Sequence, residues 1–418
     1  MKINHKGTSA APNQPACVGP IAPYIGRFAK FLASEGYVAF TINAKLSLVT
    51  ALSRWLKRHG LSLVELDERT LKQFYNYCSA SIGRGDVFTG RQLLEFLRST
   101  ELIPAPPQRL DSTALGKLTR DYERFLSSEC GLARSTVTAY LLIVRRFLTE
   151  QFKDRQLHFD ELRPQDLNRF ILGQAQRVSR AHAGATVTAL RSFLRFLRQR
   201  GAIKIDLATS LFGVARWRLS HIPKFLPPDQ VKRLLQCCDR NLPSGQRDYA
   251  ILLLLARLGL RGGEVLSMTL DDLDWERGEI VVRGKGQRLE RLPLPKDVGA
   301  ALVHYLRYVR PTCSTRTLFI RTKAPRRGLR LNGICYVVRR ALKRAGLNPD
   351  FKGAHLLRHS LATKMLNRGA SLEEIGQLLR HRQPTTTQIY AKSISKHCAP
   401  LPCRGWEVRY ECVTNRLP

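Results

Sequence analysis

Long apolar stretches are missing from this sequence. Its most apolar run, Ile251–Ala256, is far shorter than the roughly 20 residues that cross a bilayer. The chain opens with the polar, basic segment Met1–Lys6, not with a basic stretch followed by an apolar core and a small-residue cleavage site. We therefore expect a cytoplasmic protein with no membrane partner.

The spacing that favours a structural zinc site is also missing. Ten cysteines are present, but no two of them form a Cys-x-x-Cys pair. Cys237 and Cys238 are adjacent, and a looser group near the end contains His397, Cys398, Cys403 and Cys412. Cytosolic thiols stay reduced, so we expect free cysteines, no bound metal and no cofactor. The acidic triad of a metal-dependent nuclease is not apparent either.

Acidic residues are scarce beside basic ones. The 418 residues include 69 Lys and Arg against 33 Asp and Glu, which gives a formal net charge of +36 spread along the whole chain. Such a surface attracts nucleic acid, and double-stranded DNA is the partner we expect. Charge alone sets only the class of partner, since a ribosome-associated or merely basic protein would fit equally well.

The apolar residues that are present mostly follow the 3.6-residue period of amphipathic helices. The segment Lys30–Leu46 also reads much like Arg124–Leu141. Further along, three apolar residues of the first half align with three of the second, Leu66, Leu71 and Phe74 with Leu162, Leu167 and Phe170. Two interpretations stay open: a helical module duplicated at a spacing of about 95 residues, or chance likeness between amphipathic helix pairs.

The last third has a different pattern. Glu279–Arg283 and Leu289–Leu294 alternate like strands on either side of a Gly-Lys-Gly-Gln turn, and Leu273–Trp275 is a candidate third strand. Helices then resume, including Ser371–His381, whose start has a capping box. We predict a mainly α fold with a small antiparallel β-sheet, in which helical domains precede an α+β domain.

Two proline-rich stretches mark the expected boundaries, Leu102–Leu110 and Ser220–Pro228. We expect a helical N-terminal module over 1–105, with the duplicated helices as one explanation of it. A second helical domain over 106–215, a third domain over 222–395 and a tail over 396–418 follow.

Breaking a phosphodiester without metal requires a nucleophile, cations on the non-bridging oxygens and an acid for the leaving oxygen. Arg261, in GLRGGEVLSM, stands at a helix-to-helix corner, where its planar guanidinium suits two phosphate oxygens. Lys285 lies at the tip of the predicted hairpin, where a long cation can reach a bound duplex. Each residue alone would be an ordinary surface cation.

His355 and Arg358, in GAHLLRHSLATKML, are three residues apart on one helical face. His359 projects about 100° round the helix from Arg358, and we leave it out of the site. His381 ends the helix EEIGQLLRH, and Tyr390 follows in PTTTQIYAK. A tyrosine is a suitable nucleophile because its phosphodiester keeps the energy of the broken bond.

The boxes GLRGGE, HLLRHSLAT and TTTQIY resemble the signature boxes of the tyrosine recombinase, or phage integrase, family. The likeness is strong over Leu226–Lys392 and weaker over Leu110–Ala208, which looks like the SAM-like core-binding domain of such enzymes. It implies a site-specific recombinase that cuts and rejoins DNA without metal or ATP, for integration, excision or transposition of a bacterial mobile element. A homotetramer on synapsed, nucleoid-associated DNA, with related recombinases as further partners, is also implied.

The resemblance also implies a role for each residue. Arg261 and Arg358 would hold the scissile phosphate and His381 would hydrogen-bond it. Lys285 would protonate the departing 5′ oxygen. His355 would help to accept and return the tyrosine proton, and Tyr390 would form a 3′-phosphotyrosine. These six residues are the expected catalytic set.

One motif departs from the family pattern: Leu379-Arg380-His381 stands where Leu-Gly-His is usual, so Arg380 either touches DNA or is simply exposed. Alternative functions are a type IB topoisomerase-like nicking-closing activity and a DNA-binding regulator that lacks the chemistry. Relaxation would need no paired sites, whereas recombination would.

Overall fold

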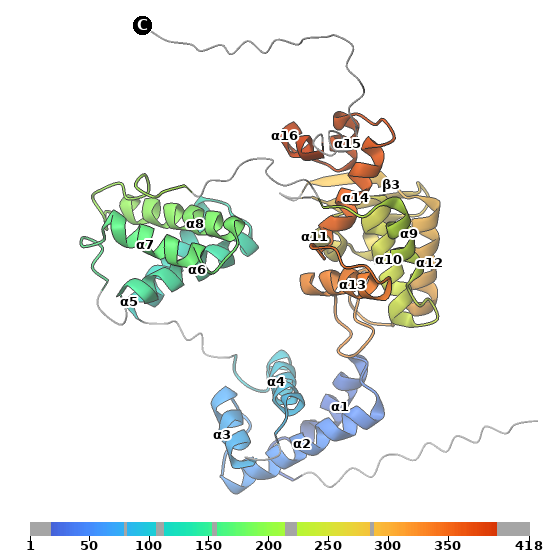
Figure 1. The fold of residues 1–418 in the computed structure, drawn as a ribbon. Coiled ribbons are helices and arrows are strands. Elements are labelled where there is room, and N and C mark those ends of the chain that lie inside the picture. The colour runs from blue at the N-terminus through green and yellow to red at the C-terminus, as the bar shows by residue number, and fades with distance from the viewer. Residues whose placement is uncertain are drawn as a thin grey trace, which may run out of the picture. The chain divides into compact units, whose positions relative to one another are not determined.

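The computed structural model describes residues 18–78, 82–105, 113–152, 157–213, 224–284 and 288–390. The chain separates into two compact units, one formed by Met1–Ala105 with His221–Pro418 and the other by Pro106–Ser220. Figure 1 shows the elements of each unit. Among the described residues, no helix combines the length and the apolar character that a membrane span requires.

The N-terminal part of the first unit consists of helices around a small apolar core. After a short 3₁₀ helix, η1 (Ala22–Tyr24), come α1 (Ile25–Ser34), α2 (Ala39–Arg58), α3 (Glu68–Cys78) and α4 (Arg84–Ser99). The expected apolar period holds in α1, where Phe28 and Leu32 are fully buried. Gly36 ends α1 with φ +87°, a conformation that glycine adopts without strain.

The second unit repeats this order of helices. Its elements are α5 (Ala114–Arg124), a π-helical turn η2 (Phe125–Glu129), α6 (Arg134–Phe152), α7 (Pro164–Ala175) and α8 (Arg180–Gln199). The aligned apolar residues of the two halves are all buried, namely Leu66, Leu71, Phe74, Leu162, Leu167 and Phe170. The common burial pattern is what a duplication would produce, and duplication stays a proposal.

Ring packing in the two cores is also alike. Phe28 and Phe31 of α1 lie 5.4 and 5.3 Å, centroid to centroid, from Phe96 of α4. In the second unit, three rings at the equivalent places have separations of 5.2 and 5.3 Å, Tyr122 and Phe125 against Phe196. In both cores a ring pair, from α1 in one and from α5 and η2 in the other, packs against one ring of the last helix.

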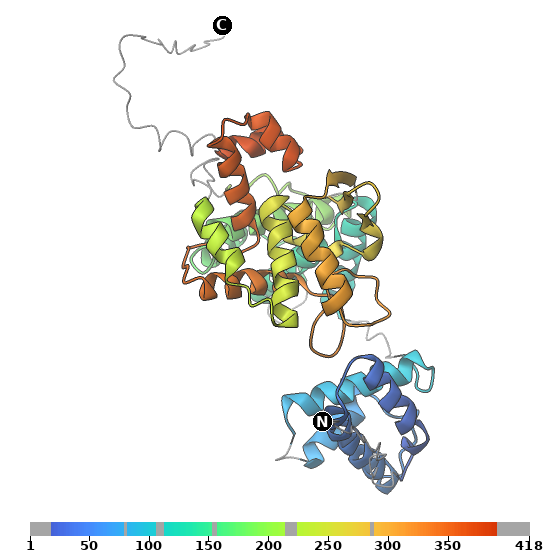
Figure 2. The same cartoon turned by 90° about the vertical axis from the view of Figure 1, so that its right-hand side faces the viewer.

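The C-terminal part of the first unit contains helices and the small sheet. Its helices are α9 (Pro228–Gln236), α10 (Pro243–Arg257), α11 (Gly262–Ser267), α12 (Lys296–His304), α13 (Leu331–Arg344), α14 (His355–Leu366), α15 (Leu372–Leu378) and α16 (Pro384–Thr387), with shorter turns η3 (Leu270–Asp272), η4 (Tyr305–Val309) and η5 (Gln388–Tyr390). The most apolar run of the sequence, Ile251–Leu255 in α10, is at most 1% exposed. Helix α10 packs on α12 and α14 at the centre of this core (Figure 1, Figure 2).

The predicted sheet is confirmed. Strands β1 (Leu273–Asp274), β2 (Glu279–Arg283) and β3 (Leu289–Pro293) pair antiparallel in the order β1-β2-β3. Ile280 faces Leu292 across the β2–β3 ladder, and Val282 faces Glu290. The buried pattern alternates along β2, with Ile280 and Val282 pointing to the core. The tip of this hairpin, residues 285–287, lies outside the described residues.

The predicted helix Ser371–His381 is shorter than expected. The capping box is present, because the Ser371 hydroxyl accepts from the Glu374 N–H at 3.1 Å and Glu374 accepts from the Ser371 N–H at 2.7 Å. Helix α15 ends at Leu378, however, because Arg380 adopts φ +56°. The Arg380 N–H then donates to the Gln377 carbonyl and the His381 N–H to the Gly376 carbonyl, which is a Schellman-type C-terminus. His381 therefore lies in a turn.

Candidate active site

Arg261 begins the site at the corner between α10 and α11. It is the N-cap of α11, and its own backbone N–H donates to the Glu264 carboxylate at 2.8 Å. The other Glu264 oxygen accepts from Arg261 Nη1 at 2.6 Å, and Arg261 Nη2 donates to the Arg380 carbonyl at 3.4 Å. The corner therefore fixes this guanidinium at both ends.

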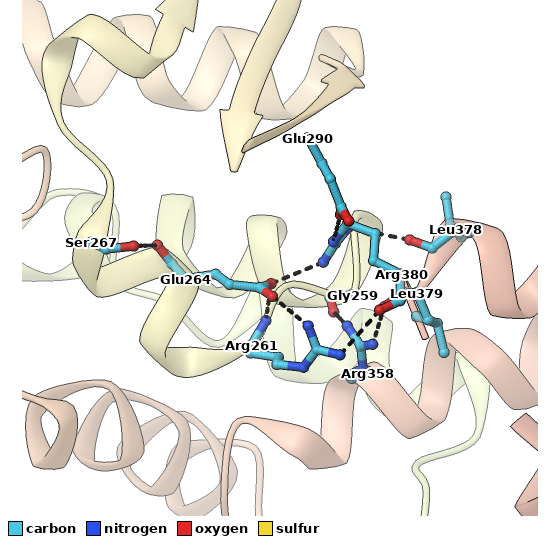
Figure 3. A network of polar contacts seen from close by, with 9 residues as sticks. All are labelled: Gly259, Arg261, Glu264, Ser267, Glu290, Arg358, Leu378, Leu379 and Arg380. Atoms are coloured by element: carbon cyan, nitrogen blue, oxygen red, sulfur yellow. Dashed lines mark hydrogen bonds and ion pairs between the residues drawn. The ribbon is translucent and has the colours of Figure 1, made fainter. Parts of the chain in front are cut away.

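Arg358 reaches the same place from α14. Its side chain is 3% exposed, and its two terminal nitrogens donate to the Gly259 and Leu379 carbonyls. Those carbonyls belong to the turns that end α10 and α15. Figure 3 shows the guanidinium groups of Arg261 and Arg358 next to each other between these turns.

Arg380 adds a third guanidinium and corrects the expectation that it is simply exposed. Its side chain is 5% exposed and pairs with Glu264 at 2.9 Å and with Glu290 of β3 at 3.3 Å. A buried charge needs such partners because removal from water is costly. The pair with Glu290 ties the hairpin to the turn that contains His381 (Figure 3).

The electrostatic balance of this cluster leaves room for an anion. Burial first, then the charges of Arg261 and Arg380, lowers the pKa of Arg358 to about 10, although Glu264 acts in the opposite direction. Burial raises the pKa of Glu264, but hydrogen bonds and charges from Arg261 and Arg380 lower it more, so this pKa is below its ordinary value. Cations that repel one another in a buried place are stabilised by an incoming anion. A phosphate group fits that requirement.

His381 lies at the edge of this cluster, in the turn after α15. Its Nδ1 is 2.8 Å from the Thr387 hydroxyl. Burial first, then Arg358 and Arg261, lowers its pKa to about 4. At neutral pH the ring is therefore uncharged, and its second nitrogen is available for a hydrogen bond to a ligand.

Tyr390 ends η5 and lies beside His381, with ring centroids 6.4 Å apart and planes 3° from parallel. Only 1% of its surface is exposed, and it packs with Ile375 and Leu379. Burial raises the pKa of its hydroxyl to about 12, although Arg358 and Arg261 act in the opposite direction. The phenol is thus protonated at neutral pH and needs a proton acceptor before it can act as a nucleophile.

His359, which the sequence argument left out, is the residue that contacts this hydroxyl. Its Nδ1 is 2.8 Å from Tyr390 Oη. His359 projects about 100° round the helix from Arg358. His359 is also four residues after His355, so the two imidazoles share a face, with ring centroids 6.2 Å apart. That spacing is the signal that could have identified it.

The last two predicted residues are His355 and Lys285. His355 opens α14 with an exposed side chain, but desolvation and the charges of Arg358 and Arg261 lower the pKa of its imidazole, so it lies at the surface beside the same cluster. Lys285 lies outside the described residues. Within the described ranges, no three His, Cys, Asp or Glu side chains gather where they could hold a metal ion.

The cluster opens into a wide groove of about 1230 Å³. Residues of the hairpin and of the turns around α15 and α16 line it, among them Arg261, Arg288, Arg291, Arg380, His381 and Arg382. Five arginines line the groove against two carboxylates, Glu290 and Glu373, and this excess of positive charge suits a polyanion rather than a small neutral ligand.

Comparison with known proteins identifies the relatives of this chain. Residues 224–397 match the Phage integrase family, and residues 120–201 match the Phage integrase N-terminal SAM-like domain. The chain is 42% identical over 377 residues to the Sinorhizobium fredii protein named integrase/recombinase y4rA, which covers 90% of this chain and 92% of that one. Tyrosine recombinase XerC of Lactobacillus delbrueckii subsp. bulgaricus is 30% identical over 290 residues, 67% of this chain and 95% of that one.

Solved structures show the same fold. XerH site-specific recombinase bound to a palindromic difH substrate superposes with a TM-score of 0.55 at 20% identity, over 68% of this chain and 83% of that one. A lambda integrase dimer bound to a COC′ core site gives 0.54 at 17% identity, over 77% and 91%. From its sequence relatives, the chain belongs to the phage integrase family of tyrosine recombinases, enzymes that cleave and rejoin DNA strands.

Proposed function

We propose that this chain recombines DNA at specific sites through a 3′-phosphotyrosine at Tyr390, for the integration, excision or transposition of a bacterial mobile element. The observation that carries the proposal is the position of Arg261, Arg358 and Tyr390. The two guanidinium groups bind the turn after α15, and their charges lower the pKa of Tyr390, so the nucleophile lies beside cations that can bind a phosphate. A metal-free phosphoryl transfer needs cations held in place before the phosphate arrives.

The proposed reaction assigns a task to each group. Arg261 and Arg358 bind the non-bridging oxygens, and the neutral His381 donates a hydrogen bond to one of them. Tyr390 Oη forms a bond to phosphorus while the bond from phosphorus to the 5′ oxygen breaks. Lys285 gives a proton to that 5′ oxygen, and His355 helps to accept the proton that leaves the Tyr390 hydroxyl. In rejoining, the 5′ hydroxyl of a partner duplex attacks the phosphotyrosine.

Burial of Tyr390 adds a requirement to this proposal. With 1% of the residue exposed, the hydroxyl cannot meet a phosphate unless the segment α16–η5 moves when DNA binds. The Thr387–His381 bond belongs to the same segment, so the tyrosine and His381 would shift together.

The partner and the assembly follow from the same reasoning. Double-stranded DNA is the proposed substrate, which is supported by XerH bound to a palindromic difH substrate and by the lambda integrase dimer bound to a COC′ core site. We propose that residues 106–215 and 222–395 hold the duplex as core-binding and catalytic domains, and that residues 1–105 are a duplicated helical module. Four copies, alone or with related recombinases, would act together on two synapsed sites at the nucleoid, with the tail 396–418 between protomers.

A trapping assay tests the nucleophile. Purified protein is incubated in EDTA with a nicked suicide duplex made from an end of the mobile element, and the products are separated on a denaturing gel. Wild type is expected to give a slow protein–DNA adduct, while Tyr390→Phe gives none because it lacks the attacking oxygen. Tyr308→Phe is the matched control, since Tyr308 is 73% exposed and outside the site.

The outcomes separate the alternatives. An adduct formed by Tyr390→Phe would show that another residue is the nucleophile. Tight binding by wild type without any adduct would favour a DNA-binding regulator. An adduct together with relaxation of any supercoiled plasmid, but without strand exchange between paired sites, would favour a nicking-closing enzyme.

A further inference from the structure

The hydroxyl that the proposed function uses is already engaged by a second histidine. Tyr390 Oη lies 2.8 Å from His359 Nδ1, and the two ring centroids are 5.6 Å apart. Tyr390 comes from η5 and His359 from the middle of α14. Two elements separated in sequence by α15 and α16 are therefore joined at the one atom that has to lose a proton.

The direction of this hydrogen bond follows from the acidities of its partners. Burial first, then His355 and Arg358, lowers the pKa of His359 to about 4, so the imidazole is neutral at neutral pH. The phenol O–H of Tyr390 is a stronger acid than the N–H of a neutral imidazole. Tyr390 therefore donates, and His359 Nδ1 accepts through its free lone pair.

We propose that His359 is a further catalytic residue, the group that receives the Tyr390 proton as the phenolic oxygen bonds to phosphorus. The inference rests on the proposed role of Tyr390 as nucleophile. It moves the proton-accepting task from His355 alone to the histidine that touches the reacting oxygen.

The proton and the electron pairs balance in this step. The O–H bond of Tyr390 breaks, its proton passes to His359 Nδ1, and the freed pair forms the bond to phosphorus. The pair of the breaking bond stays on the 5′ oxygen, which takes a proton from a separate acid. In rejoining, His359 returns the proton to the phenolate that leaves phosphorus. No metal, oxidant or external base is needed.

The groups around His359 explain why it can hold that proton only when DNA is bound. His355 and Arg358 face it on α14, His381 lies across the Tyr390 ring, and Arg261 stands behind Arg358. All of these are cationic or become so on protonation. A phosphodiester bound by the arginines brings a negative charge, which raises the basicity of His359 at the moment when the acceptor is needed.

The test compares His359→Gln, His359→Ala and the control His304→Gln. A glutamine oxygen can accept a hydrogen bond but cannot carry a proton. His304 is an exposed histidine beside Tyr308, far from the proposed chemistry in sequence. Adduct formation on the nicked suicide duplex is measured as a single-turnover rate between pH 5 and 9. DNA binding by gel shift and thermal unfolding show that each variant is folded.

Both His359 variants are expected to bind DNA normally and to form adduct about 10²–10⁴-fold more slowly, whereas His304→Gln matches wild type. Added imidazole should restore part of the rate of His359→Ala, because it can diffuse into the space and accept the proton. The acid limb of the pH–rate profile should be lost in His359→Gln, since the glutamine does not titrate.

A substrate with sulfur in place of the bridging 5′ oxygen gives an independent readout. A thiolate leaves without protonation, so this substrate should rescue a variant that lacks the acid but not one that lacks His359. Rescue of His359→Gln by the sulfur substrate would overturn the proposal, as would a wild-type rate in that variant. Faster cleavage by the variants would overturn it too and would show that His359 restrains the tyrosine.

Failure of the underlying mechanism would look different. In that case wild type itself forms no adduct, or Tyr390→Phe forms one. Either result contradicts the proposed function whatever the His359 variants do. A defect of His359→Gln in DNA binding would assign His359 to the architecture of the site and would also overturn the proposal.

Discussion

Arg380 combines two features that rarely occur together in one residue. Its backbone has φ +56°, which costs a non-glycine residue roughly 1–2 kcal/mol, and its buried guanidinium pairs with Glu264 and Glu290. Strain of this kind persists where the surroundings require the residue. The side-chain pairs are therefore expected to outweigh the backbone cost.

Replacing Arg380 separates these contributions. Arg380→Ala keeps the strain and loses the pairs, whereas Arg380→Gly loses both. We expect the glycine variant to be more stable than the alanine variant by about 1 kcal/mol, with both less stable than wild type. Urea unfolding measures the difference, and exposed Arg382→Ala is the control. An alanine variant as stable as wild type would mean that the ion pairs contribute nothing net, whereas a glycine variant as stable as wild type would mean that they only offset the backbone cost.

Single residues also show where sequence reasoning stopped. The side chains of Arg261, Arg358 and Tyr390 could be selected from the sequence, because their motifs resemble the signature boxes of the family in order and spacing. His359 could not be selected by its angle from Arg358, since its partner comes from η5. Burial of Arg380 depended on Glu290, which lies 90 residues away in the chain.

Among the elements, the end of α10 makes two separate demands on one residue. Gly259 has φ +57°, and a Cβ placed there would lie 2.7 Å from Leu379 Cδ2 and 3.2 Å from Leu361 Cδ2. Its carbonyl also accepts from Arg358. The element therefore needs glycine both for its backbone and for close packing against the turn that ends α15.

A matched pair of substitutions tests this end of the helix. Gly346 ends α13 in the same way, with φ +62°, but a Cβ there meets nothing within 4 Å. Both Gly→Ala changes should cost about 1 kcal/mol from the backbone. Gly259→Ala should cost more, and it should also slow adduct formation because it displaces the carbonyl that holds Arg358. Equal unfolding midpoints for the two variants would contradict this reading.

Local signals predicted the elements well where the cause was local. The alternation of Glu279–Arg283 and the capping box at Ser371 both depend on neighbouring residues, and both are present. The helix end at Leu378 was missed because an arginine, not a glycine, takes the left-handed position. The ion pairs of the Arg380 side chain with Glu264 and Glu290 offset the backbone cost of the left-handed conformation.

At the scale of the whole molecule, the sequence predicted a mainly helical protein with one small sheet because periodicity and turn residues carry that information. The repeated packing of Phe28 and Phe31 on Phe96, and of Tyr122 and Phe125 on Phe196, could not be read from the sequence. The alignment of the first helices does not continue at one spacing through the last ones. The ring contacts in the structure show which aromatic residues of the two modules correspond, although their spacing in the sequence changes along the modules.

The net charge of +36 makes a prediction about the whole molecule on DNA. Affinity for a duplex should fall steeply with salt, by about 10³–10⁵ between 50 and 200 mM if six to ten phosphates are neutralised. Arg288→Ala and Arg382→Ala, which change the groove, should each reduce the slope of log K against log salt by about 1. Arg344→Ala, at an exposed position that does not line the groove, should leave the slope unchanged. Fluorescence anisotropy of a labelled duplex measures all four proteins. If only Arg344→Ala lowered the slope, the phosphate backbone would run across α13 and the groove would not be the DNA-binding surface.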